Sequence, residues 1–238
     1  MVEWFWRRRP RIPAPRLRSK EDAPPPARVD LHEFTPEPPE FFARAAYVEL
    51  VLFERLARAG TSTPTTAIRS ALARAADAPL SRHRAFVTEI ERMGADPGEA
   101  MDRRRAAVDR FQRLTVGADW LEDTATAHFA GGFLDDLFRS LATGLPVELQ
   151  ARTREILARR SEDGVCAVLL REAMERDERL QSRLALWGRR ILGDAMLVAR
   201  DALELGEDRS GAEQRIEPAF SELIADHTRR MDALGLSA

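Results

Sequence analysis

Cysteine is almost absent from this sequence of 238 residues, and Cys166 is its only example. A single thiol excludes an intramolecular disulfide framework, and such scarcity is typical of proteins in a reducing compartment. The sequence also has no run of about 18 apolar residues, so we expect no membrane span. The first 30 residues lack the continuous apolar stretch of a secretory signal. A cytoplasmic location follows as the expectation.

Strand-like patterns are missing as well, because almost nothing alternates with period two and the β-branched residues do not cluster. The apolar fraction is 44% and the charged fraction 32%, which is typical of amphipathic helices that turn a charged face to water. We therefore predict an all-α protein. The expected helices are 40–59, 65–93, 98–114, 118–142, 147–176, 178–205 and 212–234. Pro79 either kinks the second helix or divides it in two.

Proline divides the chain into two parts, since nine of its fourteen prolines precede residue 40. We expect residues 1–39 to form an extended or disordered tail and residues 40–238 to form the helical domain. Trp4, Phe5 and Trp6 precede three arginines in this basic tail. The tail either anchors to an anionic membrane surface or RNA, or is a solvated leader. The remaining chain is mildly acidic and has no general electrostatic reason to bind nucleic acid.

The long helices suggest an arrangement. The pairs 40–93 and 118–176 can form the two halves of a four-helix bundle, joined by the segment 94–117. The last two helices would then pack on its outside.

Titratable residues interrupt the apolar faces of three of these helices. Glu49 falls in the apolar stripe of the first helix, with Phe42, Ala45, Ala46, Leu52, Phe53 and Leu56. A buried carboxylate needs a partner, so Glu49 either pairs with an arginine or binds a metal. His83 continues the apolar stripe of Leu72, Ala76 and Leu80 in the second helix. It is either a histidine packed in the core or a metal ligand. Glu122 is either a metal ligand or a carboxylate that the helix dipole stabilises at the start of its helix.

Several motifs resemble a known family. They are Tyr47–Leu50, Phe53–Ala57, Arg84–Val87, Met93–Pro97, Asp119–Glu122, Leu184–Arg190 and His227–Met231. Together they resemble bacterial ferritin-like proteins related to the MiaE-type tRNA hydroxylases, over residues 40–238. The resemblance implies a ferritin-like antiparallel four-helix bundle with additional C-terminal helices.

The resemblance also implies a di-iron site that this sequence only partly supplies. Such bundles take single glutamates from two helices and a Glu-x-x-His pair from each of the other two. Glu49 and Glu122 match the single glutamates, and His83 matches one histidine. The positions three before the four histidines are Val29, Leu80, Ala125 and Ile224, so no Glu-x-x-His occurs. Further ligands would have to come from residues such as Glu54, His128 or Asp163.

We therefore favour a structural or binding module with a degenerate metal site, which would act as a homodimer. The alternative is an O₂-dependent non-heme iron hydroxylase that acts on a modified tRNA base or another organic substrate. In that case iron would be held by Glu49, His83 and Glu122.

Overall fold

The computed structural model describes residues 31–159, 164–205 and 209–237. These residues form helices and connecting turns, and the described part of the chain contains no strand. The prediction of an all-α bundle is confirmed. The α-helices are α1 (Pro38–Thr61), α2 (Thr66–Arg92), α3 (Pro97–Asp102), α4 (Ala106–Leu114), α5 (Trp120–Leu141), α6 (Val147–Leu157), α7 (Val165–Arg176), α8 (Glu178–Asp201) and α9 (Arg209–Asp232). Two single 3-10 turns, η1 (His32–Phe34) and η2 (Ala142–Gly144), accompany them.

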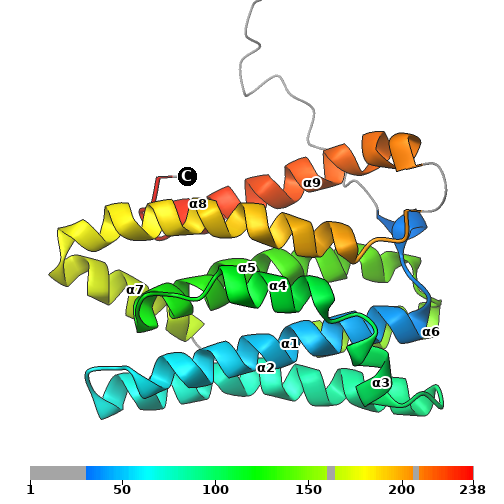
Figure 1. The fold of residues 1–238 in the computed structure, drawn as a ribbon, viewed down its shortest axis with the longest axis horizontal. Helices are drawn as coiled ribbons and strands as arrows, with labels where there is room; N and C mark the ends of the chain where they lie inside the picture. The colour runs from blue at the N-terminus through cyan, green and yellow to red at the C-terminus, as the bar shows by residue number, and fades with distance from the viewer. Residues whose placement is uncertain (1–30, 160–163, 206–208, 238) are drawn as a thin grey trace, which may run out of the picture.

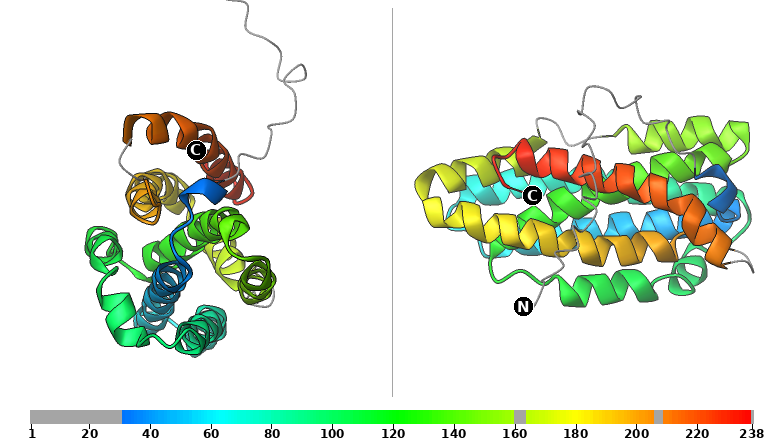
Figure 2. Two further views of the ribbon diagram at one scale, coloured as in Figure 1. Left: turned by 90° about the vertical axis from the view of Figure 1, so that its right-hand side faces the viewer. Right: turned by 90° about the horizontal axis from the view of Figure 1, so that it is seen from above.

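Helix α5 is the centre of the assembly. It packs on α1 on one side and on α8 and α9 on the other, as the end-on view in Figure 2 shows. Helices α1 and α2 form a hairpin, and α6 and α7 contact both α2 and α5 (Figure 1). The four corners α1, α2, α5 and α6–α7 thus enclose a common interior. Phe129, Phe133 and Leu137 of α5 are completely buried.

Two of the expected helices are broken. The segment 98–114 divides into α3 and α4, which allows α3 to contact α1 and α2 while α4 lies between α1 and α8. The segment 147–176 divides into α6 and α7, and Gly164 precedes α7 with a φ of 58°, a left-handed conformation that suits glycine. By contrast, α2 is continuous through Pro79, so this proline does not divide it.

The N-terminal boundary of the packed structure lies before residue 40. Leu31 and Phe34 are buried, and the backbone carbonyl of Phe34 accepts a hydrogen bond of 2.9 Å from the Glu204 amide. Residues 31–39 were expected to belong to an extended or disordered tail, but the side chains of Leu31 and Phe34 pack in the core of the bundle. The aromatic and basic residues 1–30 lie outside the described residues. No helix in the described parts of the chain is long and apolar enough to cross a membrane.

Candidate functional site

A cluster of charged side chains lies in the interior where α1, α2 and α5 meet. Arg82 Nη1 donates to Glu49 Oε1 at 3.1 Å and to Asp135 Oδ1 at 2.7 Å. Arg82 Nε donates to the Arg159 carbonyl at 2.7 Å, and Arg139 lies 3.5 Å from the second oxygen of Asp135. Only 4% of the Glu49 side chain and 10% of the Arg82 side chain are exposed. We call Glu49, Arg82, Asp135 and Arg139 the acid–arginine cluster.

Burial dominates the ionisation of this cluster. Desolvation raises the pKa of Glu49 from 4.5 to about 8, although Arg82 opposes the change. Burial also raises the pKa of Asp135, against the effects of Arg82 and Arg139. For Arg82, burial lowers the pKa, but the carboxylates of Glu49 and Asp135 outweigh it and raise the pKa overall. Arg82 is therefore a cation, while Glu49 holds a proton near neutral pH.

A cavity of about 290 Å³ opens beside this cluster, between α1, α2, α5, α7 and α9. This volume is at the small end of the roughly 300–1,000 Å³ of pockets that hold organic molecules. Asp136 and Arg230 form an ion pair at its edge, and His128 and Cys166 also line it. Burial, with Arg230 and His227, lowers the pKa of His128 to about 4. Burial raises the pKa of Cys166 to about 12, so the cavity presents a neutral imidazole and a thiol rather than a thiolate.

The pair Gly131–Gly132 explains how neighbouring side chains approach α5 at this cavity. A Cβ on Gly131 would lie 3.4 Å from Leu52 of α1, and a Cβ on Gly132 would clash with Nε of Arg230 from α9. Close packing of α1 and α9 against α5 thus accounts for the two adjacent glycines, and α5 continues through both without a break. Gly132 allows the Arg230 guanidinium to lie against α5 and to line the cavity.

His83 does not join Glu49 in a common site. Its Nδ1 lies 2.9 Å from the Ala46 carbonyl oxygen of α1, and the residue is half-buried. The preceding residue, Arg82, is the one that faces the interior. The buried stripe of α2 runs through Leu72, Pro79, Arg82, Phe86 and Ile90 rather than through Leu80, His83 and Val87. The expected stripe was wrong here because a buried arginine reads as a surface residue in a hydrophobicity pattern.

Glu122 lies at the start of α5, where its side chain accepts a hydrogen bond from the backbone. Its Oε2 accepts a hydrogen bond of 2.7 Å from the Ala118 amide, while Asp119 Oδ1 accepts from the amides of Leu121 and Glu122 at 3.0 Å. Asp119 thus satisfies two amides that the first turn of a helix leaves free, and Glu122 satisfies the Ala118 amide just before the helix. Arg183 of α8 lies 3.6 Å from Glu122. This geometry corresponds to the helix-start interpretation of Glu122.

The three residues expected to share a metal are thus in different surroundings. Glu49 contacts α5 through the Arg82 link to Asp135, thirteen residues beyond Glu122 along that helix. At 1.5 Å per residue, Asp135 and Glu122 are about 20 Å apart along α5. Across residues 31–159, 164–205 and 209–237, no group of three His, Cys, Asp or Glu side chains could hold a metal ion. The present donors therefore do not fit a di-iron centre built from Glu49, His83 and Glu122.

The other ligand candidates are also dispersed. Glu54 is exposed and accepts a hydrogen bond of 3.4 Å from Gln112. His128 lines the cavity, and Asp163 lies outside the described residues.

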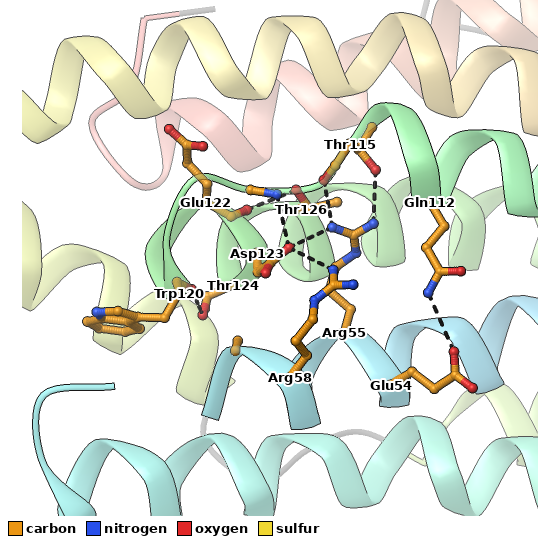
Figure 3. Close-up of polar contacts among 12 residues, drawn as sticks. Glu54, Arg55, Arg58, Gln112, Thr115, Trp120, Glu122, Asp123, Thr124 and Thr126 are labelled. Carbon is orange, nitrogen blue, oxygen red and sulfur yellow. Dashed lines mark hydrogen bonds and ion pairs between the residues drawn. The ribbon is translucent and has the colours of Figure 1, made fainter. Parts of the chain in front are cut away.

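A second interior charge, which the sequence pattern did not reveal, joins α1 to the loop before α5. Arg55 is completely buried, and its Nη1 donates to Asp123 Oδ1 at 2.8 Å and to the Thr115 carbonyl at 2.6 Å. Figure 3 shows this guanidinium between Thr115 and Asp123. Asp123 Oδ1 also accepts from Arg58 and from the Gly117 amide, each at 3.2 Å. These contacts hold the chain before α5 against the bundle.

The C-terminal motifs contribute packing contacts. Trp187 Nε1 of α8 donates to Thr126 Oγ1 at 2.9 Å, and His227 Nε2 of α9 donates to the Gly188 carbonyl at 3.1 Å. Burial lowers the pKa of His227, so this imidazole is neutral and donates from one nitrogen. The ring centroid of His227 lies 5.5 Å from that of Phe129. Both motifs therefore fasten α8 and α9 to α5.

Comparison with known families gives a match to the ferritin-like domain of actinomycetes over residues 37–207. This match spans α1 to α8, including the acid–arginine cluster. The chain therefore belongs to that ferritin-like family. A comparison with curated proteins finds no match.

Proposed function

We propose that this protein is a non-catalytic ferritin-like module, with a structural or binding role, in which an arginine pairs with the interior carboxyl groups of Glu49 and Asp135. The observation that carries the proposal is Arg82, whose guanidinium bonds both Glu49 and Asp135. In metal-binding bundles, carboxylates from facing helices surround a metal cation. Here the guanidinium of Arg82, a cation that belongs to the protein itself, bonds to Glu49 and Asp135.

Protonation supports the same proposal. Metal ligands must be deprotonated, so a carboxyl group whose pKa is about 8 pays for ionisation before it can bind a cation near neutral pH. A metal ion would also have to displace Arg82. A guanidinium that stays buried after losing its carboxylate partners is destabilising. Both terms lower the affinity of Glu49 and Asp135 for iron.

The alternative is a MiaE-like iron hydroxylase that acts on a modified tRNA base. It is supported by the resemblance of the sequence motifs and by the burial of Glu49 in the first helix of a ferritin-like fold. It requires that Arg82 leave the carboxylates and that further ligands approach Glu49.

The iron content after anaerobic reconstitution with Fe²⁺ distinguishes these functions. Inductively coupled plasma mass spectrometry on the desalted full-length protein should find far less than one iron per chain. Stoichiometric iron that is lost in Glu49→Gln would overturn the proposal and favour the hydroxylase. Glu148→Gln is the matched control, because Glu148 is an exposed glutamate at the start of α6.

A further inference from the structure

Two buried polar atoms of opposite character line the cavity without hydrogen-bond partners among the residues that the structure describes. They are Oε2 of Glu49 and Nη1 of Arg230. The Glu49 side chain is 4% exposed, and its other oxygen already accepts from Arg82. The other terminal nitrogen of Arg230, Nη2, donates to Asp136. A buried polar atom without a partner costs roughly 1–3 kcal/mol, so both atoms favour an occupant that satisfies them.

The charges around the cavity indicate the net charge of this occupant. Three carboxyl groups and three guanidinium groups line it: Glu49, Asp135, Asp136, Arg82, Arg139 and Arg230. Their formal charges cancel once Glu49, which holds a proton near neutral pH, is ionised by a cation beside it. A ligand that is itself neutral overall, but carries one group of each sign, matches this balance. A simple amine would leave Arg230 without a partner, and a simple anion would leave an ionised Glu49 without one.

Much of the remaining wall of the cavity is aliphatic, beside His128 and Cys166. It includes Leu52, Leu56, Ala75, Ala78, Pro79 and Ala127. Such a wall favours a hydrocarbon stem, because burying apolar surface contributes about 25 cal/mol per Å². The cavity therefore combines two polar ends with an apolar middle.

We propose that this cavity binds a small zwitterion of the amino-acid class, whose ammonium donates to Glu49 Oε2 and whose carboxylate accepts from Arg230 Nη1. The short aliphatic stem lies against Leu52 and Leu56. An ammonium supplies the positive charge that ionised Glu49 lacks, so binding lowers the pKa of this carboxyl group. The inference rests on the binding role proposed above and gives it a ligand class.

Gly132 has a positioning role in this site. Because a side chain there would clash with Arg230, the glycine allows the guanidinium to reach the cavity. Gly193 of α8 is a matched glycine, since a Cβ at that position meets no atom within 4 Å. A comparison of substitutions at Gly132 and Gly193 separates the displacement of Arg230 from the general effect of replacing a glycine in a helix.

Binding is tested on the full chain by isothermal titration calorimetry with a series of straight-chain amino acids. The probes are glycine, β-alanine, 4-aminobutyrate, 5-aminovalerate and 6-aminohexanoate, with butylamine and butyrate as single-charge controls. One chain length, or two neighbouring ones, should bind at least roughly tenfold more tightly than either control, as expected for one added charged hydrogen bond of about 1.5–3 kcal/mol. No binding by any member, or equal binding by butylamine or butyrate, would overturn the proposal and leave water as the occupant.

Variants place the ligand in the cavity. Glu49→Gln should weaken the preferred probe by roughly tenfold or more, while the exposed control Glu148→Gln should bind as the parent does. If Glu49→Gln does not fold by circular dichroism, Gly132→Ala decides, because it should weaken binding whereas Gly193→Ala should not. Unchanged binding in the informative variant contradicts the assignment. Failure to bind at low iron content refutes the ligand class alone, whereas stoichiometric iron refutes the proposed function.

Discussion

Arg82 on α2 donates a hydrogen bond to Glu49 on α1, with Nη1 and Oε1 3.1 Å apart in the interior of the bundle. The same nitrogen reaches Asp135 on α5, so one guanidinium links three helices. A chain of the ferritin-like family thus carries a protein cation among its interior acids. The cluster contributes to stability as well as to the character of the cavity.

Removal of this cation should destabilise the fold. Arg82→Met leaves Asp135 with Arg139 and leaves Glu49 without an ionic partner. We expect a loss of roughly 3 kcal/mol, at the lower end of the range for broken buried pairs, because Glu49 can remain protonated. Arg176→Met, which removes an exposed i,i+4 pair with Glu172, should cost less than about 1 kcal/mol. Urea denaturation measures both, and equal losses would contradict the interior role of Arg82.

The stability of the protein should depend on the ionisation of Glu49. Its folded-state pKa of about 8 exceeds its ordinary value of 4.5, so the folded protein holds this proton over that window while the unfolded chain releases it. The free energy of unfolding therefore falls as pH rises from about 5 to 8, by at most about 1.4 kcal/mol per unit from this group.

Glu49→Gln removes this titration. The stability of the variant minus that of the parent should increase from pH 5 to pH 9, because groups that titrate alike in both proteins cancel in the difference. Urea denaturation at both pH values provides the test. A difference that is constant or that decreases over this range would show that the Glu49 pKa is not raised.

Two substitutions at Glu122 distinguish a helix cap from a metal ligand. Glu122→Gln retains an oxygen that can accept from the Ala118 amide, so its stability should change little. Glu122→Ala loses the bond and should cost about 1 kcal/mol, which is typical for a capping side chain. Thermal unfolding measures this order, and the iron content should be the same in both variants. A large effect of the Gln variant on iron content would assign Glu122 to a metal site instead.

Most of the helices could be predicted from the sequence, because each carries a three-to-four residue apolar period and proline or capping residues near its ends. Asp96 is an example, since it accepts from the Glu99 amide at the start of α3. The break between α6 and α7 was missed, although five polar residues in a row, 159–163, precede Gly164. The last helix was expected at 212–234, and α9 runs from Arg209 to Asp232 with Pro218 inside it.

The site was less predictable than the fold. Glu49 was correctly placed on a buried face, where an arginine was one of the two expected partners. Its partner Arg82 is 33 positions away, and the contact depends on how α1 and α2 rotate against each other. No local pattern contains that rotation. The same holds for Arg55, which appears in the sequence as one of many surface arginines and is completely buried in the structure.

Arg55 and Asp123 should be strongly coupled. Arg55→Leu leaves the buried Asp123 with the half-exposed Arg58, and should cost roughly 3–5 kcal/mol. Adding Asp123→Asn removes the uncompensated charge, so the double variant should be less destabilised than the sum of the two single ones. A double-mutant cycle by urea denaturation measures this coupling. Simple additivity would contradict the ion pair shown in Figure 3.

The most direct test of the arginine-for-metal account is anomalous diffraction at the iron edge from crystals grown after anaerobic exposure to Fe²⁺. The account predicts guanidinium density between Glu49 and Asp135, with no anomalous peak within bonding distance of either carboxyl group. An iron peak bound to Glu49, with Arg82 turned away, would contradict it.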